Sequence, residues 1–302
     1  MCNVMENIII AKGGLELTLC LPSFENGYYR GTRFDHSGIF RKIVLDGFTL
    51  ADEWFDNYNP LSHDAVCGTS EEFGESGYAD AEVGDVFIKP GVGLLLKEDD
   101  APYDHFKLYK VADSGSWTVT TNDDEAVFIH VVDSDDWGYV YEKVVRIIDG
   151  NHYEISHRLC NTGQKKFEGE MYNHNFFTFG EAKPGPEIEI DFPFEPCGNW
   201  RAEYDSVALS NSGIRFSRPI EKGESVFMGN LKPSDGSDVT GEVFSMSAAG
   251  HRVTFGADLP FHRIAFWSNH RVGCIEPFIP YCLEPGDELE WTYTYEMKKG
   301  AE

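Results

Sequence analysis

Strict alternation of apolar and polar residues is the feature that most limits the folds open to this chain. The clearest example lies near the end, where five apolar residues alternate with five polar ones: Leu289, Trp291, Tyr293, Tyr295 and Met297 with Glu288, Glu290, Thr292, Thr294 and Glu296. Because successive side chains of a strand point to opposite faces, this pattern predicts a β-strand with one face in the core. The Pro-Gly-Asp sequence directly before it is typical of a turn.

Two earlier segments predict β-hairpins. The first has β-branched runs between residues 117 and 132, on either side of an Asn-Asp-Asp turn at 122–124. The second alternates over 153–160, turns at an Asn-Thr-Gly sequence at 161–163, and returns over 167–177. Both patterns are typical of antiparallel strand pairs joined by a short turn.

Helical periodicity is sparse, and the best short helix candidates lie at 51–58 and 202–209. Many strands of similar spacing with hardly any helix predict an all-β protein, a large antiparallel β-sandwich or barrel and not a parallel α/β sheet. The chain has 302 residues, enough for a substantial core, and no linker or internal repeat interrupts it. We therefore expect a single domain spanning residues 1–302.

The charge of the chain limits its partners. It carries 51 acidic and 25 basic residues, a formal net charge of -26. Such a field repels phosphate backbones and anionic lipid head groups, so we expect neither nucleic acid nor a membrane as partner. It also disfavours a phosphorylated sugar unless a local Arg/Lys cluster overrides it, and no such cluster is apparent in the sequence. The acidic run at 133–136 is read as a solvated loop and not as a calcium site.

Targeting and redox signals point to the cytoplasm. Residues 1–12 lack the basic region and cleavage site of a signal peptide, and no apolar run is long enough to cross a bilayer. Seven cysteines form an odd set without a Cys-x-x-Cys pair, which predicts neither a disulfide framework nor a zinc site. They stand at Cys2, Cys20, Cys67, Cys160, Cys197, Cys274 and Cys282.

The segment 167–177 carries the strongest chemical signal. Its alternation places Glu168, Glu170, Tyr172 and His174 on one face, with Phe167, Met171 and Asn173 on the other. If the second face packs the core, the histidine faces outward. The Asn-His-Asn-Phe-Phe sequence at 173–177 suits a sugar site, in which polar groups fix hydroxyls and a ring covers an apolar sugar face. A histidine held by neighbouring backbone groups is the competing interpretation.

These motifs resemble those of the galactose mutarotase (aldose 1-epimerase) superfamily. The turn at 161–163 and the sequence at 173–177 are similar to the family's stretch ending in Asn-His-x-x-Phe, whose histidine is the catalytic acid. The family also places a catalytic glutamate on a late strand near a proline, and Cys-Ile-Glu-Pro-Phe at 274–278 fits. The resemblance implies a large antiparallel β-sandwich in which His174 is the acid and Glu276 the base.

The first half of the chain supplies substrate-binding candidates. Residues 30–38 are similar to an early hairpin of that family, and Arg33 with Asp35 is expected there to bind hydroxyls. A structural pairing of these two residues across a turn is the alternative. The family's second histidine, in a Leu-His-Gly-Gly motif, is missing; the region 63–74 offers His63 or Glu72 instead. Tyr172 and Asn173 complete the predicted substrate-binding set.

The resemblance implies interconversion of the α and β anomers of a free sugar by acid–base ring opening. That reaction requires no metal, nucleotide or other cofactor, and the expected partner is a small carbohydrate, bound by a monomer or homodimer. Two other functions stay open: a non-catalytic carbohydrate-binding protein, or a lyase or hydrolase. The last would need two carboxylates at glycosidase separation, or a Tyr/His pair beside a uronic acid.

Overall fold

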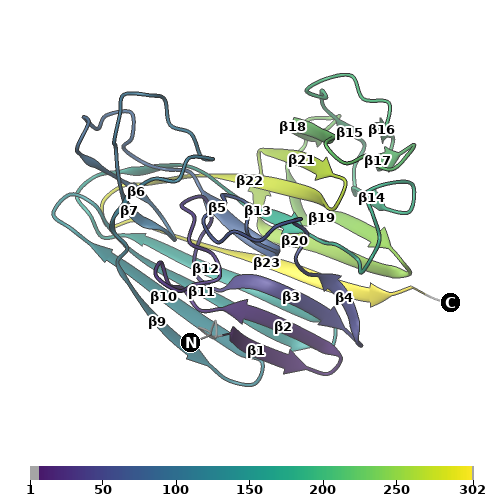
Figure 1. Cartoon of the computed structure of the whole chain (residues 1–302), viewed down its shortest axis with the longest axis horizontal. Helices are drawn as coiled ribbons and strands as arrows, with labels where there is room; N and C mark the ends of the chain where they lie inside the picture. The colour runs from purple at the N-terminus through teal and green to yellow at the C-terminus, as the bar shows by residue number, and fades with distance from the viewer. Residues whose placement is uncertain (1–6, 301–302) are drawn as a thin grey trace.

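Antiparallel strands form all the regular secondary structure of the computed structural model over residues 7–300, the residues that the structure describes (Figure 1). A ten-stranded sheet has the order β16-β17-β14-β19-β20-β23-β12-β11-β10-β9. Its strands are β9 (Ser116–Thr121), β10 (Glu125–Asp133), β11 (Gly138–Asp149), β12 (His152–Asn161), β14 (Glu189–Asp191), β16 (Val207–Ser210), β17 (Gly213–Phe216), β19 (Val239–Ala248), β20 (His251–Phe261) and β23 (Glu288–Lys299).

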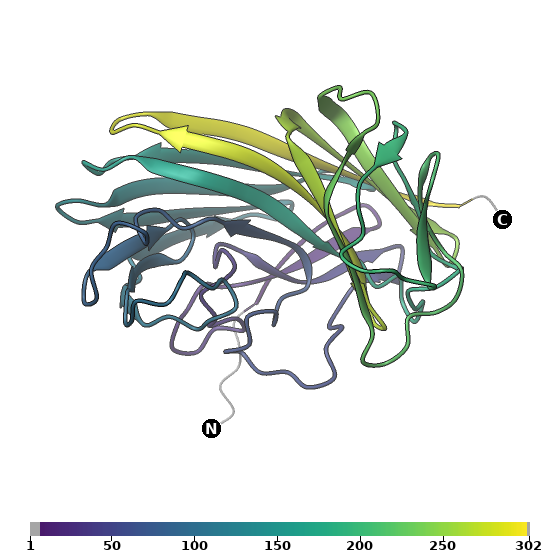
Figure 2. The ribbon, with the colours of Figure 1, turned by 90° about the horizontal axis from the view of Figure 1, so that it is seen from above.

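A six-stranded sheet, in the order β15-β18-β21-β22-β13-β5, packs against the ten-stranded one. Its strands are β5 (Gly68–Phe73), β13 (Phe167–Phe176), β15 (Pro196–Cys197), β18 (Ser225–Pro233), β21 (Arg263–Asn269) and β22 (Gly273–Leu283). Seen from above, the long teal and yellow strands run alongside one another in curved layers (Figure 2). The predicted all-β, antiparallel sandwich is confirmed.

Two smaller sheets flank the sandwich. The amino-terminal one contains β1 (Asn7–Lys12), β2 (Leu15–Cys20), β3 (Ile39–Leu45) and β4 (Phe48–Ala51). The other contains β6 (Val86–Lys89), β7 (Gly93–Leu96) and β8 (Val111–Asp113). Of the expectation for residues 1–12, the first six residues, Cys2 included, lie outside the described residues. Over residues 7–300 no helix is long and apolar enough to span a membrane.

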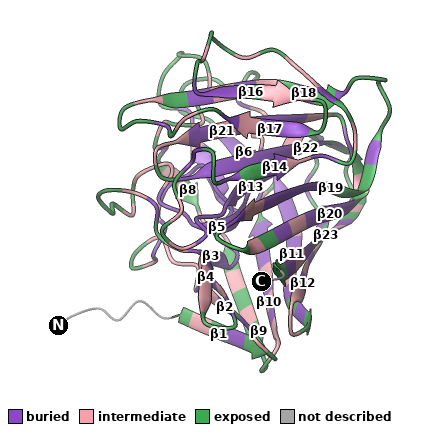
Figure 3. Ribbon diagram, turned by 90° about the vertical axis from the view of Figure 1, so that its right-hand side faces the viewer, coloured by how far each residue is buried: buried purple, intermediate pink, exposed green. Residues whose placement is uncertain are grey.

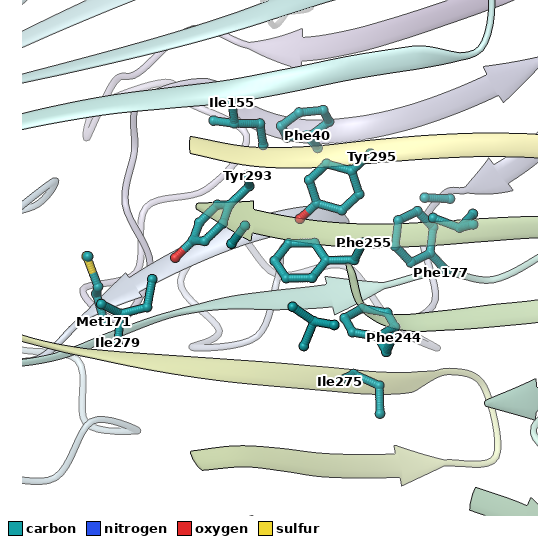
Figure 4. Close-up of a cluster of buried hydrophobic side chains, with 14 of the residues drawn as sticks. Phe40, Ile155, Met171, Phe177, Phe244, Phe255, Ile275, Ile279, Tyr293 and Tyr295 are labelled. Carbon is teal, nitrogen blue, oxygen red and sulfur yellow. The ribbon is translucent and has the colours of Figure 1, made fainter. Parts of the chain in front are cut away.

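The core lies between the two large sheets, whose strands carry most of the buried residues (Figure 3). Tyr293 and Tyr295 from β23 and Ile275 and Ile279 from β22 belong to one hydrophobic cluster (Figure 4). The alternation predicted for the last strand is confirmed, since its tryptophan, tyrosines and methionine are buried while its glutamates and threonines are exposed or half-buried. The hairpin predicted between residues 117 and 132 is confirmed as β9 and β10.

The second predicted hairpin is wrong, because its strands belong to different sheets. β12 pairs with β11 and β23, whereas β13 pairs with β22 and β5. Asn161 stabilises the segment that passes from β12 in one sheet to β13 in the other. Its amide donates to the carbonyls of Lys165 and Leu283, both at 2.9 Å, and its oxygen accepts from the Gly163 backbone N–H at 3.0 Å. The predicted turn therefore carries the chain from one sheet to the other.

The two predicted helices are also absent from residues 51–58 and 202–209. Short isolated helices are marginal in water, so tertiary contacts decide the conformation of such segments. Trp54 illustrates this: its indole donates to the Val66 carbonyl at 2.9 Å, and its ring stacks on Phe176 with centroids 5.2 Å apart. These contacts hold residues 52–58 in an irregular path. In the second segment, residues 202–206 are irregular and residues 207–209 belong to β16.

Candidate active site

Strand register places the site residues in rows on the face of the six-stranded sheet that points away from the core. Tyr172 on β13 is the partner of both Glu72 on β5 and Phe278 on β22, and Phe278 is the partner of Arg263 on β21. Side chains two positions apart share a face, so the next row contains His174 and Glu276. The sequence prediction that His174 points away from the core agrees with this register.

A cavity of about 840 Å³ opens over these rows, within the size range of small-molecule sites. Of the eight residues predicted for the site, six line it: Arg33, His63, Glu72, Tyr172, His174 and Glu276. The elements that supply them are β5, β13 and β22 together with loops from the first half of the chain. Residues far apart in the sequence therefore meet in one cavity.

His174 and Glu276 form a buried pair at the floor of this cavity. The Nε2 atom of His174 lies 3.1 Å from Oε1 of Glu276, and the two residues are 3% and 5% exposed. Phe176 stacks on the imidazole with centroids 3.9 Å apart, and Trp267 meets it edge-on at 6.2 Å. The Nδ1 atom has no hydrogen-bond partner among the described residues. Aromatic packing therefore holds the imidazole, while its Nε2 faces the carboxyl.

Burial moves the pKa values of this pair in opposite directions. It raises the pKa of Glu276 to about 7, since a carboxylate loses hydration in this setting. Burial also lowers the pKa of His174 well below its usual value, and the nearby Arg33 guanidinium adds to this. A carboxyl that titrates near neutrality beside a weakly basic imidazole can exchange protons with a ligand.

Glu72 is the centre of a charged network on one side of the cavity. It accepts from Nε of Arg33 at 2.6 Å, from Nδ1 of His105 at 3.2 Å, from Nζ of Lys89 at 3.5 Å and from the Tyr172 hydroxyl. Burial alone would raise its pKa, but Arg33, Lys89 and His105 hold it well below the usual value. Glu72 is therefore an ionised carboxylate whose hydrogen bonds are already taken.

Arg33 is the cation that this network presents to the cavity. Its Nη2 donates to the Tyr172 hydroxyl at 2.9 Å, and its Nη1 lies 3.4 Å from Nδ1 of His63. Burial lowers the pKa of His63, which suits an imidazole that accepts from an arginine. Because a guanidinium carries five N–H donors and three are used here, two remain for a ligand.

Asp35 and Asn173 are not part of the cavity lining, which corrects their assignment as substrate-binding residues. Asp35 is fully buried, at 3.3 Å from Nζ of Lys143, and Asn173 donates to Glu71 at 3.1 Å. Arg33 does not pair with Asp35, so the alternative pairing across a turn is also wrong. Asn173 follows the alternation of β13 toward the core, where a buried amide requires a partner.

Sequence reasoning missed several residues of the lining. Glu170 shares a strand face with His174, so alternation alone could have found it. His105 and Phe106 lie in the 97–110 loop, where no periodic pattern exists to indicate orientation. Trp54 and Arg201 were missed for the same reason, because they also lie in irregular segments without a periodic pattern. Among residues 7–300 no cluster of three His, Cys, Asp or Glu side chains is arranged to hold a metal ion.

Solved structures with the same architecture identify this fold. A galactose mutarotase-like protein from Clostridium acetobutylicum matches 97% of this chain and 95% of its own, at 12% identity and a TM-score of 0.57. A galactose mutarotase-like protein from Lactobacillus casei ATCC 334 matches 97% of this chain and 100% of its own, at 10% identity and a TM-score of 0.56. This chain has the galactose mutarotase-like fold.

The galactose mutarotase-like fold extends over nearly the whole chain. A galactose 1-epimerase from Lactobacillus acidophilus NCFM matches 98% of it and 95% of its own length, at 11% identity and a TM-score of 0.56. No protein-family model matches the sequence, and no curated protein is significantly similar to it. The resemblance predicted from the motifs is thus confirmed for the fold, at identities typical of a divergent branch.

Proposed function

We propose that this protein is an aldose 1-epimerase-like enzyme that interconverts the α and β anomers of a free, unphosphorylated sugar. The observation that carries the proposal is the His174–Glu276 pair, 3.1 Å apart at the floor of a cavity of about 840 Å³. The fold supports it, because solved structures described as a galactose 1-epimerase or as galactose mutarotase-like share it. Because a fold alone does not determine function, the proposed chemistry rests on this chain's own residues.

Ring opening needs two proton transfers, one at each of the two oxygens bonded to C1. A base removes the proton from the anomeric hydroxyl while an acid protonates the ring oxygen, and the bond between C1 and the ring oxygen breaks. The products are an open-chain aldehyde and a ring oxygen that has become a hydroxyl. Rotation about the C1–C2 bond followed by the reverse transfers gives the other anomer. Because both oxygens are bonded to C1, the acid and the base must lie close together, as His174 and Glu276 do.

Glu276 is the base in this scheme and His174 the acid. A pKa of about 7 leaves Glu276 partly ionised at neutral pH and basic enough to take the hydroxyl proton. The lowered pKa of His174 makes its protonated form a strong acid, which suits the weakly basic ring oxygen. The competent state holds one proton on the pair, on the imidazole. Because the pKa of Glu276 lies above that of His174, this is the minor of the two protonation states, and the proton must first move from the carboxyl to the imidazole.

Arg33 is the substrate-binding residue of the proposal, and Glu72 positions it. The two N–H donors of Arg33 that remain unused can bind a hydroxyl of the sugar. Glu72 and Tyr172 are engaged with Arg33 and with each other, so they act through the arginine. His63 accepts from the same guanidinium and fixes it from the opposite side.

The test is anomer exchange measured by NMR on a panel of free hexoses and pentoses, comparing wild type with His174→Asn and Glu276→Gln. Each variant is expected to lower kcat at least about 100-fold, the usual contribution of a positioned acid or base. His152→Asn and Glu168→Gln are the matched controls, since His152 lies half-buried at the start of β12, Glu168 lies exposed near the start of β13, and neither lines the cavity. Thermal unfolding of every variant establishes that it is folded.

The outcomes separate this proposal from its alternatives. Exchange that is unaltered in both site variants would exclude the catalytic assignment. Calorimetric sugar binding by a wild-type protein that gives no exchange above buffer would identify a non-catalytic carbohydrate-binding protein. Release of reducing ends from a polysaccharide panel would identify a hydrolase or lyase instead.

A further inference from the structure

The cavity continues past the His174–Glu276 pair along the sheet. Strand order on the far side of the pair is β22, β21 and β18, and Phe227 on β18 lines the same cavity. Neighbouring strands lie about 4.8 Å apart, so Phe227 stands on a strand roughly 10 Å from that of Glu276. A single pyranose with its C1 at the pair and a hydroxyl on Arg33 covers only part of this width.

The volume of the cavity leads to the same conclusion. One hexose occupies on the order of 200 Å³, judged against about 30 Å³ for one water in the liquid. The cavity of about 840 Å³ therefore has room for more than one sugar ring.

The far end of the cavity is built as a ring platform. Phe227 is the register partner of Trp267, so two aromatic residues stand side by side on adjacent strands of the sheet. Phe227 also packs against the apolar group formed by Tyr172, Ala265 and Phe278. An apolar floor with aromatic faces is the surface on which the C–H face of a sugar ring packs.

Arg201 adds hydrogen-bond donors above this platform. Its guanidinium carbon lies 4.1 Å from the centroid of Phe227, and its backbone N–H donates to the Phe227 carbonyl at 3.0 Å. Among residues 7–300 no carboxylate or other acceptor bonds to this guanidinium, whereas the other two arginines of the lining, Arg33 and Arg263, are paired with Glu72 and Glu170. The donors of Arg201 are thus free to bind a ligand.

We propose that Phe227 and Arg201 form a second sugar subsite, so that the preferred substrate is a reducing disaccharide or longer oligosaccharide. This rests on the function proposed above and names its substrate class. The reducing ring places C1 at His174 and Glu276, and the next ring, linked on the side of the reducing ring away from C1, lies beside Phe227 against the Arg201 guanidinium that covers its ring and donates to the sugar hydroxyls. Phe227 and Arg201 touch only that second ring and act on specificity.

The experiment compares anomer exchange of glucose and galactose with that of maltose, cellobiose, lactose and isomaltose. The best disaccharide is expected to show a kcat/KM at least tenfold above that of its free reducing-end sugar. Arg201→Ala and Phe227→Ala are each expected to lower this ratio at least fivefold. Arg158→Ala is the matched control, because Arg158 is an exposed arginine on β12.

Calorimetry with the same sugars separates this inference from the proposed enzymatic function. Tighter disaccharide binding that is lost in Arg201→Ala, in a protein without exchange activity, would uphold the second subsite while the enzymatic function fails. Equal affinity and equal kcat/KM for monosaccharides and disaccharides would overturn it. A preference for glucose 6-phosphate or glucuronate that depends on Arg201 would also overturn it, in favour of an anion site.

Discussion

The carboxyl of Glu276 is held where it is costly to ionise. Burial raises its pKa from about 4.5 to about 7, so between these values the folded protein binds more protons here than the unfolded chain does. Stability that depends on the protonated carboxyl is therefore present below the unfolded pKa and is lost as the pH rises through about 7. The group proposed as the base thus weakens the fold under the conditions in which it is ionised.

Glu276→Gln is therefore expected to stabilise the protein at alkaline pH relative to acidic pH. A shift of this size corresponds to on the order of 3 kcal/mol, so the free energy of unfolding of the variant, minus that of wild type, should rise by about that amount between pH 5 and pH 8. Urea unfolding at both pH values measures it. Glu168→Gln, at an exposed position on β13, should show no comparable change, and parallel pH curves for Glu276→Gln would contradict the argument.

At the scale of the strand, β5 and β13 each line the cavity with one face and contact the core with the other. Glu72 and His174 face the cavity, whereas the neighbours Glu71 and Asn173 face the core. Glu71 there joins the two large sheets, since it bonds to Lys143 from β11 and, at 3.2 Å, to His157 from β12. Burial alone would raise the pKa of Glu71, but Lys143 and His157 lower it to about 2.

Lys143→Met is expected to destabilise the protein strongly. The lysine neutralises Glu71 and also Asp35, whose pKa burial raises to about 6 in spite of this partner. Removing one member of a buried charged group leaves uncompensated charge, at a cost of about 3–5 kcal/mol. The free energy of unfolding from urea titration measures this loss.

Lys42→Met is the matched control for Lys143→Met. Lys42 pairs with Asp52 at 3.2 Å, and both side chains are 41% exposed. Exposed pairs contribute about 0–1 kcal/mol. Equal losses in the two variants would show that the buried network does not join the sheets as described.

Alternation predicted the faces of single strands correctly, but it carried no information about which strands pair. His174 and the buried face of β23 follow from local sequence, because a period of two fixes side-chain direction. The separation of β12 from β13 depends on Asn161 and on contacts with Leu283, more than a hundred residues away. The partners of Arg33 and Asp35 come from β5, β13 and β11 in the same way, so local sequence could not identify them.

At the scale of the whole molecule, the net charge of -26 opposes compaction. Raising the ionic strength from about 10 mM to 150 mM shortens the screening length from about 30 Å to about 8 Å. We expect the thermal midpoint to rise by a few degrees over this range, since about 1 kcal/mol shifts a chain of this size by roughly 2–4 °C. Calorimetric scans in sodium chloride measure the shift, and a falling midpoint would contradict self-repulsion as the dominant long-range term.

The two faces of β5 and β13 also limit how this protein can evolve. Inserting or deleting one residue in either strand would turn Glu72 and His174 inward and their structural neighbours outward. Both the proposed chemistry and the contacts that join the two sheets would then be lost together. Length changes in descendants of this gene are therefore tolerable only in the loops, and under the proposed function new sugar preferences are expected to arise in segments such as 97–110 and 198–206.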